Sequence, residues 1–441
     1  MSTLEKYNRQ VPRYTSYPTS PHFHDAISAV EYGKWLQNVP ADKPVSLYLH
    51  MPFCKQLCFY CGCHTKITHN QERIHNYTDV IIREIELVRA KIGKSLKVSH
   101  IAWGGGTPNY IETDDFERIM ATIRTHFTLL DDVEIAVECD PRVLADDMMD
   151  MFVKTGVNRI SLGVQDFNID VQEAINRVQP FELVQDCVSK LRARGISSIN
   201  FDLIYGLPKQ TAETLSETVR LTQKILPERI AVFGYAHVPW LKKHQRLMER
   251  FGLPAAPERR DLEQTTRDAL VAAGYEEIGL DHFALPTDNM AKAHREGTLK
   301  RNFQGYTTDS SEYLLGFGAS AISCIPEGYA ANDTDIPAYE ESIMNGVLTT
   351  KRGLATTESD VRRRRMIMEV MGSYSLNLSL HTEEDIEHAL DALQDMQNDG
   401  LITWEGNHMH ITDAGRPYVR TIASVFDVYL KPEEGKHSQA I

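Results

Sequence analysis

The stretch VSLYLHMPFCKQLCFYCGC, residues 45–63, joins a short apolar run to four cysteines. Cys54, Cys58 and Cys61 have the spacing C-x-x-x-C-x-x-C, and Cys63 follows two residues later. Three thiolates this close together lie on one loop, where they can bind a soft metal centre without completing its coordination. A cubane cluster has four irons, so three cysteine ligands leave one iron free for another ligand. The spacing therefore predicts an iron–sulfur centre with one open coordination position.

A structural zinc site, completed by Cys63 or His64, is the alternative interpretation of this loop. Closed zinc sites usually take their ligands from two separated pairs, which this loop does not provide. The remaining cysteines, Cys139, Cys187 and Cys324, are scattered along the chain. This odd and clustered use of cysteine is typical of a metal site in a reducing compartment, not of a disulfide framework. We therefore expect a cytoplasmic protein.

The overall charge restricts the class of partner. The 441-residue chain has 47 Lys+Arg and 61 Asp+Glu, a net charge of −14, which argues against a nucleic-acid or anionic-membrane partner. No apolar stretch is long enough to span a bilayer, and the polar N-terminus lacks the apolar core of a secretory signal. An anionic substrate would need a local basic pocket in so acidic a protein.

Between residues 45 and 240, six short apolar runs alternate with amphipathic stretches. Their lengths and their content of Val, Ile and aromatic residues fit buried parallel strands, and the stretches between them have helical periodicity. Repeated strand–helix units predict an α/β fold with a parallel sheet. Six units are fewer than the eight of a full barrel, so we expect a six-stranded partial TIM-like β/α barrel. The runs are 45–53, 98–105, 133–141, 159–167, 198–208 and 229–239.

Polar or glycine-rich residues follow five of these runs at their C-terminal ends. In parallel barrels that rim carries the chemistry. A turn that merely ends a strand is the simpler explanation for any one of them, but five together with a cysteine loop favour a functional site. They are the glycines at 104–106, Glu138, Gln165, Asp202 and His237.

The rest of the chain is organised differently. Residues 241–355 are mixed, and for LLGFGASAIS (314–323) we expect tight packing in preference to a phosphate-binding turn. From about residue 356 the pattern becomes helical and ends in a hairpin around Glu405-Gly406-Asn407, which predicts a small, mainly helical, winged-helix-like domain. We interpret Arg362 to Arg365 as a solvated helix face. The expected regions are an N-terminal arm (1–44), a barrel with its extension (45–355) and the C-terminal domain (356–441).

The glycine turn GGGTP (104–108), one strand after the cysteine loop, resembles the radical S-adenosylmethionine enzymes. Further blocks make the chain similar to the bacterial oxygen-independent coproporphyrinogen III oxidases from residue 12 to about residue 325. These blocks are PRYTSYPT (12–19), SLYLHMPFCKQLCFYCGC (46–63), WGGGTPNY (103–110), VECDPR (137–142), SLGVQDFN (161–168), FDLIYGLPKQT (201–211), YAHVP (235–239), GLDHFA (279–284), RNFQGYTT (301–308) and GASAIS (318–323).

The resemblance implies a reaction and its cofactors. Two propionate side chains of coproporphyrinogen III would be oxidatively decarboxylated to vinyl groups, giving protoporphyrinogen IX in haem biosynthesis. The oxidant would be a 5′-deoxyadenosyl radical from the reductive cleavage of S-adenosylmethionine at a 4Fe–4S cluster. An electron donor and an electron acceptor are implied without being identified. We expect a monomer with no nucleic-acid or membrane partner.

The resemblance also assigns residues by matching motif. Cys54, Cys58 and Cys61 would bind the cluster, and Tyr48, Gly105 and Glu138 would hold a first S-adenosylmethionine. The family binds a second molecule beside it, for which the matching residues are Tyr60, Gly106, Thr107, Gln165, Arg177, Asp202, Ala236 and Ile322. Tyr60 stands where phenylalanine is more familiar, and its ring should still stack on adenine.

Four further residues are implied near the substrate or cofactors without a defined role. Phe303 and Gln304 belong to the RNFQGYTT block, and Arg13 and Tyr14 belong to the PRYTSYPT arm, which could cover the mouth of the barrel. A plain surface arm remains the alternative for Arg13 and Tyr14.

Two other classes of protein compete with an oxidase. Haem-binding chaperones share the barrel and the cysteine loop but lack the cysteine matching Cys63 and the PRYTSYPT arm, both of which this chain has. An RNA-modifying radical enzyme is suggested by the C-terminal domain and its arginine run. The charge of −14 and the absence of a broad basic stripe speak against it.

Overall fold

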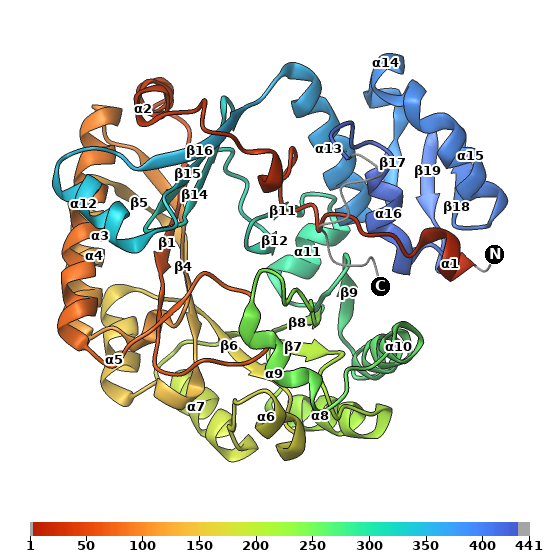
Figure 1. Ribbon diagram of the computed structural model, residues 1–441, viewed down its shortest axis with the longest axis horizontal. Coiled ribbons are helices and arrows are strands. Elements are labelled where there is room, and N and C mark those ends of the chain that lie inside the picture. Colours follow the sequence, from red (N-terminus) through yellow and green to blue (C-terminus); the bar gives the residue numbers. More distant parts are fainter. Residues whose placement is uncertain (1–2, 431–441) are drawn as a thin grey trace.

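A mixed β-sheet with helices along its outer side forms the body of the protein (Figure 1). The computed structural model describes residues 3–430. All six predicted runs are strands and pair in parallel in chain order, which confirms the α/β prediction. They are β1 (Val45–Met51), β4 (Lys97–Gly105), β5 (Thr128–Cys139), β6 (Arg159–Gln165), β7 (Ser198–Tyr205) and β8 (Arg229–Gly234).

The sheet extends beyond these six strands at both edges. β13 (Leu314–Phe317) pairs in parallel with β1, so the parallel part has one strand more than predicted. Antiparallel strands continue both edges, giving the order β16-β15-β14-β13-β1-β4-β5-β6-β7-β8-β10-β9. The added strands are β14 (Ile322–Ile325), β15 (Gly328–Asn332), β16 (Thr350–Ala355), β10 (His282–Ala284) and β9 (Glu276–Ile278).

Tight packing explains the glycines of the 314–323 block, as expected from the sequence. A Cβ on Gly316 would lie 2.8 Å from the carbonyl oxygen of Ile322, and one on Gly318 would lie 2.5 Å from that of His50. Gly318 also has φ +102°, a conformation that favours glycine. Only glycine therefore lets β13 and its turn lie this close to β1 and β14.

The amphipathic stretches form the helices that cover the sheet. α3, for example, begins after Asn70, whose side chain accepts from Arg73 N, and ends at Gly93 in the left-handed conformation. Its buried face, which includes Ile81 and Ile85, packs into the main core. The covering helices are α3 (Gln71–Ile92), α4 (Thr113–His126), α5 (Asp146–Thr155), α7 (Phe181–Ala193), α8 (Ala212–Ile225) and α10 (Ala256–Ala272).

A buried carboxyl group ties β13 to the helical layer. Glu84 on α3 accepts hydrogen bonds from Gly318 N (2.7 Å), Tyr339 OH (2.7 Å) and Asn332 Nδ2 (2.6 Å). Its side chain is buried, and burial raises the pKa of Glu84 to about 7. One titratable side chain, that of Glu84, therefore holds the turn after β13 against α3.

The N-terminal segment packs on two different parts of the molecule. α2 (Ala29–Asn38) buries Trp35 and Leu36 in the main core. Ahead of it, Tyr7 and Tyr14 are buried among C-terminal residues, and α1 (Thr3–Tyr7) lies beside the C-terminal elements in Figure 1. The segment from α1 to α2 thus connects the C-terminal region to the main core.

The C-terminal region contains the predicted helices and the predicted hairpin. β18 and β19 pair across the turn at Gly406, which has φ +61°, and β17 joins them on the other side of β19. The elements are α13 (Glu358–Ser373), β17 (Ser375–Asn377), α14 (Glu383–Ile386), α15 (Leu390–Asn398), β18 (Ile402–Glu405), β19 (His408–Ile411) and α16 (Val419–Ser424).

The interpretation of the arginine run as a solvated face is wrong for most of its members. Arg363 is buried and donates to the carbonyl of Asp385, and Arg362 pairs with the carboxylate of the same residue. Arg364 donates to the carbonyl of Tyr17 in the N-terminal arm, and Arg365 remains exposed. Three of the four charges therefore hold neighbouring segments together.

Short elements complete the described part of the chain. No helix within residues 3–430 combines the length and the apolar character needed to cross a membrane. The remaining helices and strands are β2 (Phe53–Cys54), β3 (Lys66–Ile67), α6 (Ile169–Ala174), α9 (Arg246–Glu249), α11 (Asn289–Arg295), β11 (Lys300–Asn302), β12 (Gly305–Thr307) and α12 (Ile336–Met344).

Candidate cluster and cofactor site

The cysteine loop follows β1 directly and lies at the C-terminal edge of the parallel strands. Cys54 ends β2, and Cys58, Cys61 and Cys63 follow on a loop without regular structure. Cys58 is buried, Cys54 and Cys61 are half-buried, and Cys63 is exposed. A hydrogen bond with the Cys63 thiol lowers the pKa of Cys61, although burial opposes it. Cys63 thus favours the thiolate form of its neighbour.

Two guanidinium groups donate to the sulfur of Cys58. Arg177 Nη1 lies 3.5 Å and Arg142 Nη2 lies 3.6 Å from Cys58 Sγ. Asp140 holds both arginines, with Oδ2 at 3.2 Å from Arg177 Nη1 and 2.7 Å from Arg142 Nη2. Burial opposes ionisation of Asp140, but Arg177 and Arg142 hold the pKa of its carboxyl below the usual range. Such donors stabilise negative charge on a sulfur ligand.

These thiols fit a cubane cluster better than a single metal ion. Within residues 3–430, no three His, Cys, Asp or Glu side chains lie close enough together to bind one ion. A cubane does not require that convergence, because each cysteine ligand binds a different iron. Three thiols on one loop, one of them with two cationic donors, are a donor set suited to a 4Fe–4S cluster.

The glycine turn after β4 lies against the start of the cysteine loop. Gly106 N donates to Met51 O (2.8 Å), and Thr107 N donates to Phe53 O (2.9 Å). A Cβ on Gly106 would lie 2.7 Å from that same carbonyl oxygen of Phe53. Burial raises the pKa of Cys54 to about 12, and a hydrogen bond with the Thr107 side chain lowers it. Thr107 therefore assists ionisation of the first cysteine.

Gly105 and Glu138 are in direct contact. Gly105 N donates to Glu138 Oε2 at 3.3 Å, and Gly105 has φ +108°. A Cβ at this position would lie 2.6 Å from the ring of His50. The Glu138 residue is partly exposed, but the protein around its carboxyl removes water from it. This desolvation raises the pKa of Glu138 to about 7, and repulsion by Asp202 adds to the effect. The two candidate residues for the first S-adenosylmethionine thus lie side by side.

Tyr48, the third candidate for that molecule, lies on β1 next to the same group. Its hydroxyl is 3.1 Å from His50 Nδ1, and His50 Nε2 is 3.0 Å from the carbonyl of His64. Burial raises the pKa of Tyr48, and the charge of Glu138 contributes. His50, which the sequence did not single out, fixes the tyrosine in place, and burial lowers the pKa of its ring to about 4.

Gln165 and Arg177 meet at Gly163 on β6. Arg177 Nη2 donates to Gly163 O at 2.7 Å, and a Cβ on Gly163 would lie 2.8 Å from Gln165 Nε2 and 2.9 Å from Arg177 Nη2. Gln165 has φ +67°, which turns its side chain back over the strand end. Asp202, the register partner of Gly163 on β7, accepts from Ser161 Oγ at 3.0 Å. Three predicted residues, two on strands and Arg177 on the segment after α6, therefore lie around Gly163.

Tyr60 and Ala236 are connected through Gln245. Its amide Nε2 donates to Tyr60 O (2.9 Å) and to Ala236 O (3.2 Å). Two residues just before it also bind the cysteine loop, Lys242 Nζ at 2.7 Å from Cys63 O and His244 Nε2 at 2.8 Å from Cys61 O. The turn at 242–245 thus clamps the loop. No motif in residues 242–245 predicts these contacts with the cysteine loop.

Other predicted residues lie outside this set of contacts. Ile322 begins β14 and packs with Phe303 around Tyr329, while Gln304 is exposed. Tyr14 is fully buried and donates to Asp427 in the C-terminal region. Arg13 lines a cavity that Ala236 and His237 also line.

Comparisons with known proteins cover the whole chain. Residues 48–222 match the radical SAM superfamily. An oxygen-independent coproporphyrinogen III oxidase of Bradyrhizobium diazoefficiens is 46% identical over 98% of this chain and 97% of its own length. One of Paracoccus denitrificans is 38% identical over 100% and 99%.

A solved structure agrees with these relatives. The coproporphyrinogen III oxidase of Escherichia coli, described as a radical SAM enzyme, has a TM-score of 0.90 and 36% identity and covers 96% of this chain and 100% of its own. Similarity of this extent, with the cysteine loop and strand-end residues in place, shows that the chain belongs to the oxygen-independent coproporphyrinogen III oxidase family of the radical SAM superfamily.

Proposed function

We propose that this protein catalyses the anaerobic oxidative decarboxylation of two propionate side chains of coproporphyrinogen III, giving the vinyl groups of protoporphyrinogen IX. The observation that carries the proposal is the cysteine loop on the same sheet edge as the glycine turn and the strand-end carboxylates. Full-length relatives named for this substrate supply its identity. This reaction is a step of haem biosynthesis.

The loop cysteines Cys54, Cys58 and Cys61 would bind the 4Fe–4S cluster. When bound, the reduced cluster and S-adenosylmethionine together supply a 5′-deoxyadenosyl radical that abstracts hydrogen from the propionate carbon next to the macrocycle. Arg142 and Arg177 would stabilise the negative charge at Cys58 through their hydrogen bonds to its sulfur.

Two groups of residues would hold two molecules of S-adenosylmethionine. Tyr48, Gly105 and Glu138 would bind the first, with the Glu138 carboxylate accepting from ribose hydroxyls. The contact of Gly105 with Glu138 supports this grouping. The second would lie among Tyr60, Gly106, Thr107, Gln165, Arg177, Asp202, Ala236 and Ile322. The meeting of Gln165 and Arg177 at Gly163 supports part of that set.

The same proposal includes the organisation of the chain. Residues 45–355 would form a partial barrel with its extension, preceded by an arm (1–44) and followed by a winged-helix-like domain (356–441). The protein would act in the cytoplasm as a monomer without nucleic-acid or membrane partners. An electron donor and an electron acceptor, both unidentified, would complete the reaction.

Anaerobic turnover with identification of the product tests the function. Protein reconstituted with iron and sulfide is incubated with a reductant, S-adenosylmethionine, coproporphyrinogen III and an added one-electron acceptor, and the tetrapyrrole is analysed by mass spectrometry. We expect loss of two molecules of CO₂ and formation of 5′-deoxyadenosine. Tight haem binding without a vinyl product would identify a haem-binding chaperone instead.

A further inference from the structure

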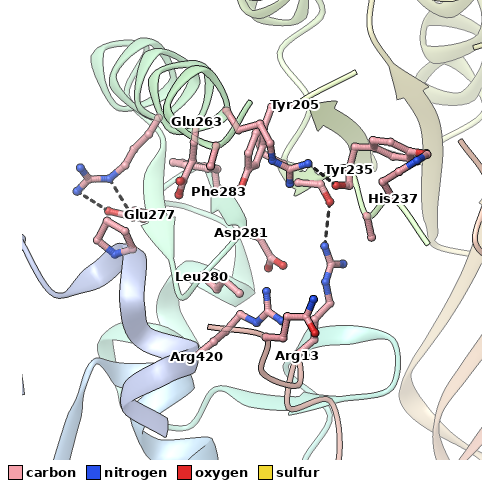
Figure 2. Close-up of a pocket in the computed structure, with 18 of the residues that line it drawn as sticks. Arg13, Tyr205, Tyr235, His237, Glu263, Glu277, Leu280, Asp281, Phe283 and Arg420 are labelled. Carbon is pink, nitrogen blue, oxygen red and sulfur yellow. Dashed lines mark hydrogen bonds and ion pairs between the residues drawn. The ribbon is translucent and has the colours of Figure 1, made fainter. Parts of the chain in front are cut away.

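A cavity of roughly 240 Å³ lies beside the proposed cofactor site, between the ends of β7 and β8, helix α10, the N-terminal arm and the C-terminal region. The described residues that line it include Ala236 and His237 but none of the cluster cysteines, Gly105 or Glu138. Figure 2 shows Arg13 and Arg420 on one side, facing Tyr205 and Tyr235 across the opening. The cavity therefore adjoins the proposed second S-adenosylmethionine site at Ala236 and contains none of the cluster ligands.

Two arginines that line the cavity each donate a hydrogen bond to a backbone carbonyl. Arg13 Nη2 donates to Gly234 O at 3.0 Å, and Arg259 Nη1 donates to Tyr235 O at 2.8 Å. The Nε of Arg259 is buried with no hydrogen-bond partner. Within residues 3–430, neither arginine forms an ion pair with a carboxylate. Both guanidinium groups thus keep donors for an anion in the cavity.

A third arginine adds positive charge to the same space. Arg420 is buried and donates to the carbonyls of Val11 and Pro12 in the arm. Burial lowers the pKa of Arg420 to about 9, and repulsion by Arg13 contributes. Arg13 and Arg420 therefore lie close enough to repel one another, a repulsion that a bound anion would relieve.

The acidic residues of the lining are already engaged or partly neutral. Glu277 accepts two hydrogen bonds of 3.0 Å from Arg267, and Asp281 lies 3.6 Å from Arg301. Burial raises the pKa of Glu263 to about 7, and the charge of Glu277 contributes. The charge of Arg13 acts on Asp281 and that of Arg259 acts on Glu263, but among residues 3–430 neither arginine forms an ion pair with these carboxylates.

We propose that this cavity binds the carboxylates of the two propionates that the reaction leaves intact, through Arg13 and Arg259. The inference rests on the proposed function, which supplies a substrate with four such side chains. Its volume lies below the ~300–1,000 Å³ of pockets that enclose a drug-sized ligand, so it suits the side chains on one edge of a tetrapyrrole, not the macrocycle. The reacting propionates must lie near the cluster, and no cluster cysteine lines this cavity. We therefore assign the cavity to the two retained propionates.

Binding of two stable porphyrins to variants of the full-length protein tests the assignment. Coproporphyrin III carries all four propionates, and protoporphyrin IX carries the two retained ones. Trp240 lines the cavity, so binding can be followed by quenching of tryptophan emission. Arg259→Met should weaken binding of both porphyrins by a similar factor, roughly 10- to 100-fold, because a charged hydrogen bond is lost.

Matched variants separate this effect from damage to the fold. Arg260→Met changes the next residue of α10, which is exposed and does not line the cavity, and should leave both affinities unchanged. Arg259→Lys keeps the charge and should recover part of the loss. Arg13→Met, on a different segment, should weaken both porphyrins as Arg259→Met does.

Each outcome decides the proposal. Equally weakened binding of both porphyrins supports it. Weakened binding of coproporphyrin III alone would assign the cavity to the reacting propionates and overturn the proposal. Unchanged binding of both porphyrins would show that the cavity is not a propionate site. Absence of a vinyl product from the wild-type protein would instead contradict the proposed function while leaving the binding result intact. In turnover, Arg259→Met should raise the KM for coproporphyrinogen III, and Arg260→Met should leave that KM at the wild-type value.

Discussion

Replacing Arg142 by methionine should lower the reduction potential of the cluster. Arg142 is one of two donors to Cys58 Sγ, at 3.6 Å. Two unit charges about 4 Å apart interact by ~4 kcal/mol at an effective permittivity near ~20. Asp140, 2.7 Å from the same nitrogen, offsets most of this, which leaves about 1–2 kcal/mol in favour of the reduced cluster. For a one-electron couple, that corresponds to a decrease of roughly 40–90 mV.

The measurement is a redox titration of the reconstituted cluster, followed by electron paramagnetic resonance of the reduced form. Iron content is determined first, so that loss of the cluster is not mistaken for a change in potential. Arg194→Met is the control, because Arg194 also pairs with an aspartate, Asp150 at 2.7 Å, but caps the C-terminal end of the covering helix α7. A potential in Arg142→Met equal to or above that of the wild type would refute the reasoning, whereas Arg142→Lys should lie between the two.

Three further predictions concern stability and iron binding. Burial raises the pKa of Glu84 from 4.5 to about 7, so the wild-type protein should lose stability as the pH rises through this range, because the buried carboxyl must ionise. Glu84→Gln should abolish up to ~3 kcal/mol of that pH dependence, measured from unfolding midpoints at pH 5 and pH 8; an unaltered dependence would contradict the assignment. Gly106→Ala places a Cβ 2.7 Å from a carbonyl oxygen and should cost about 1–3 kcal/mol, seen as a lower Tm. Gly62→Ala, with nothing within 4 Å, should melt like the wild type, and equal Tm values for the two variants would argue against the clash. Cys54→Ala should lose the cluster iron and Cys63→Ala should retain it, as iron quantification after anaerobic reconstitution would show; iron loss in Cys63→Ala would make that residue a ligand.

The parallel strands could be predicted because each is a local apolar run with a helical stretch after it. β13 could not, because Leu314–Phe317 is short and contains a glycine, and its partner β1 lies about 270 positions earlier. Its identity as a strand depends on that distant pairing, not on a local pattern. The same reason explains the arginine run, whose partners Asp385 and Tyr17 lie on other segments.

The candidate site shows a similar division. The spacing of Cys54, Cys58 and Cys61 alone predicts a cluster, whereas only the family resemblance points to Arg177. No sequence pattern assigns a role to Arg142, because its contact with Cys58 spans 84 positions. No local signal marks such a contact, so geometry had to supply it.

The contact between the two ends of the chain has a consequence for synthesis. Arg420 meets the carbonyl of Val11 across 409 positions. At ~5–20 residues per second, a ribosome needs roughly 20–80 s to produce one after the other. The cysteine loop and the turn that clamps it are complete by residue 245, so they emerge well before this contact can form. The segment that would bind the iron is thus synthesised early, whereas the C-terminal residues that line the neighbouring cavity, such as Arg420, are synthesised late.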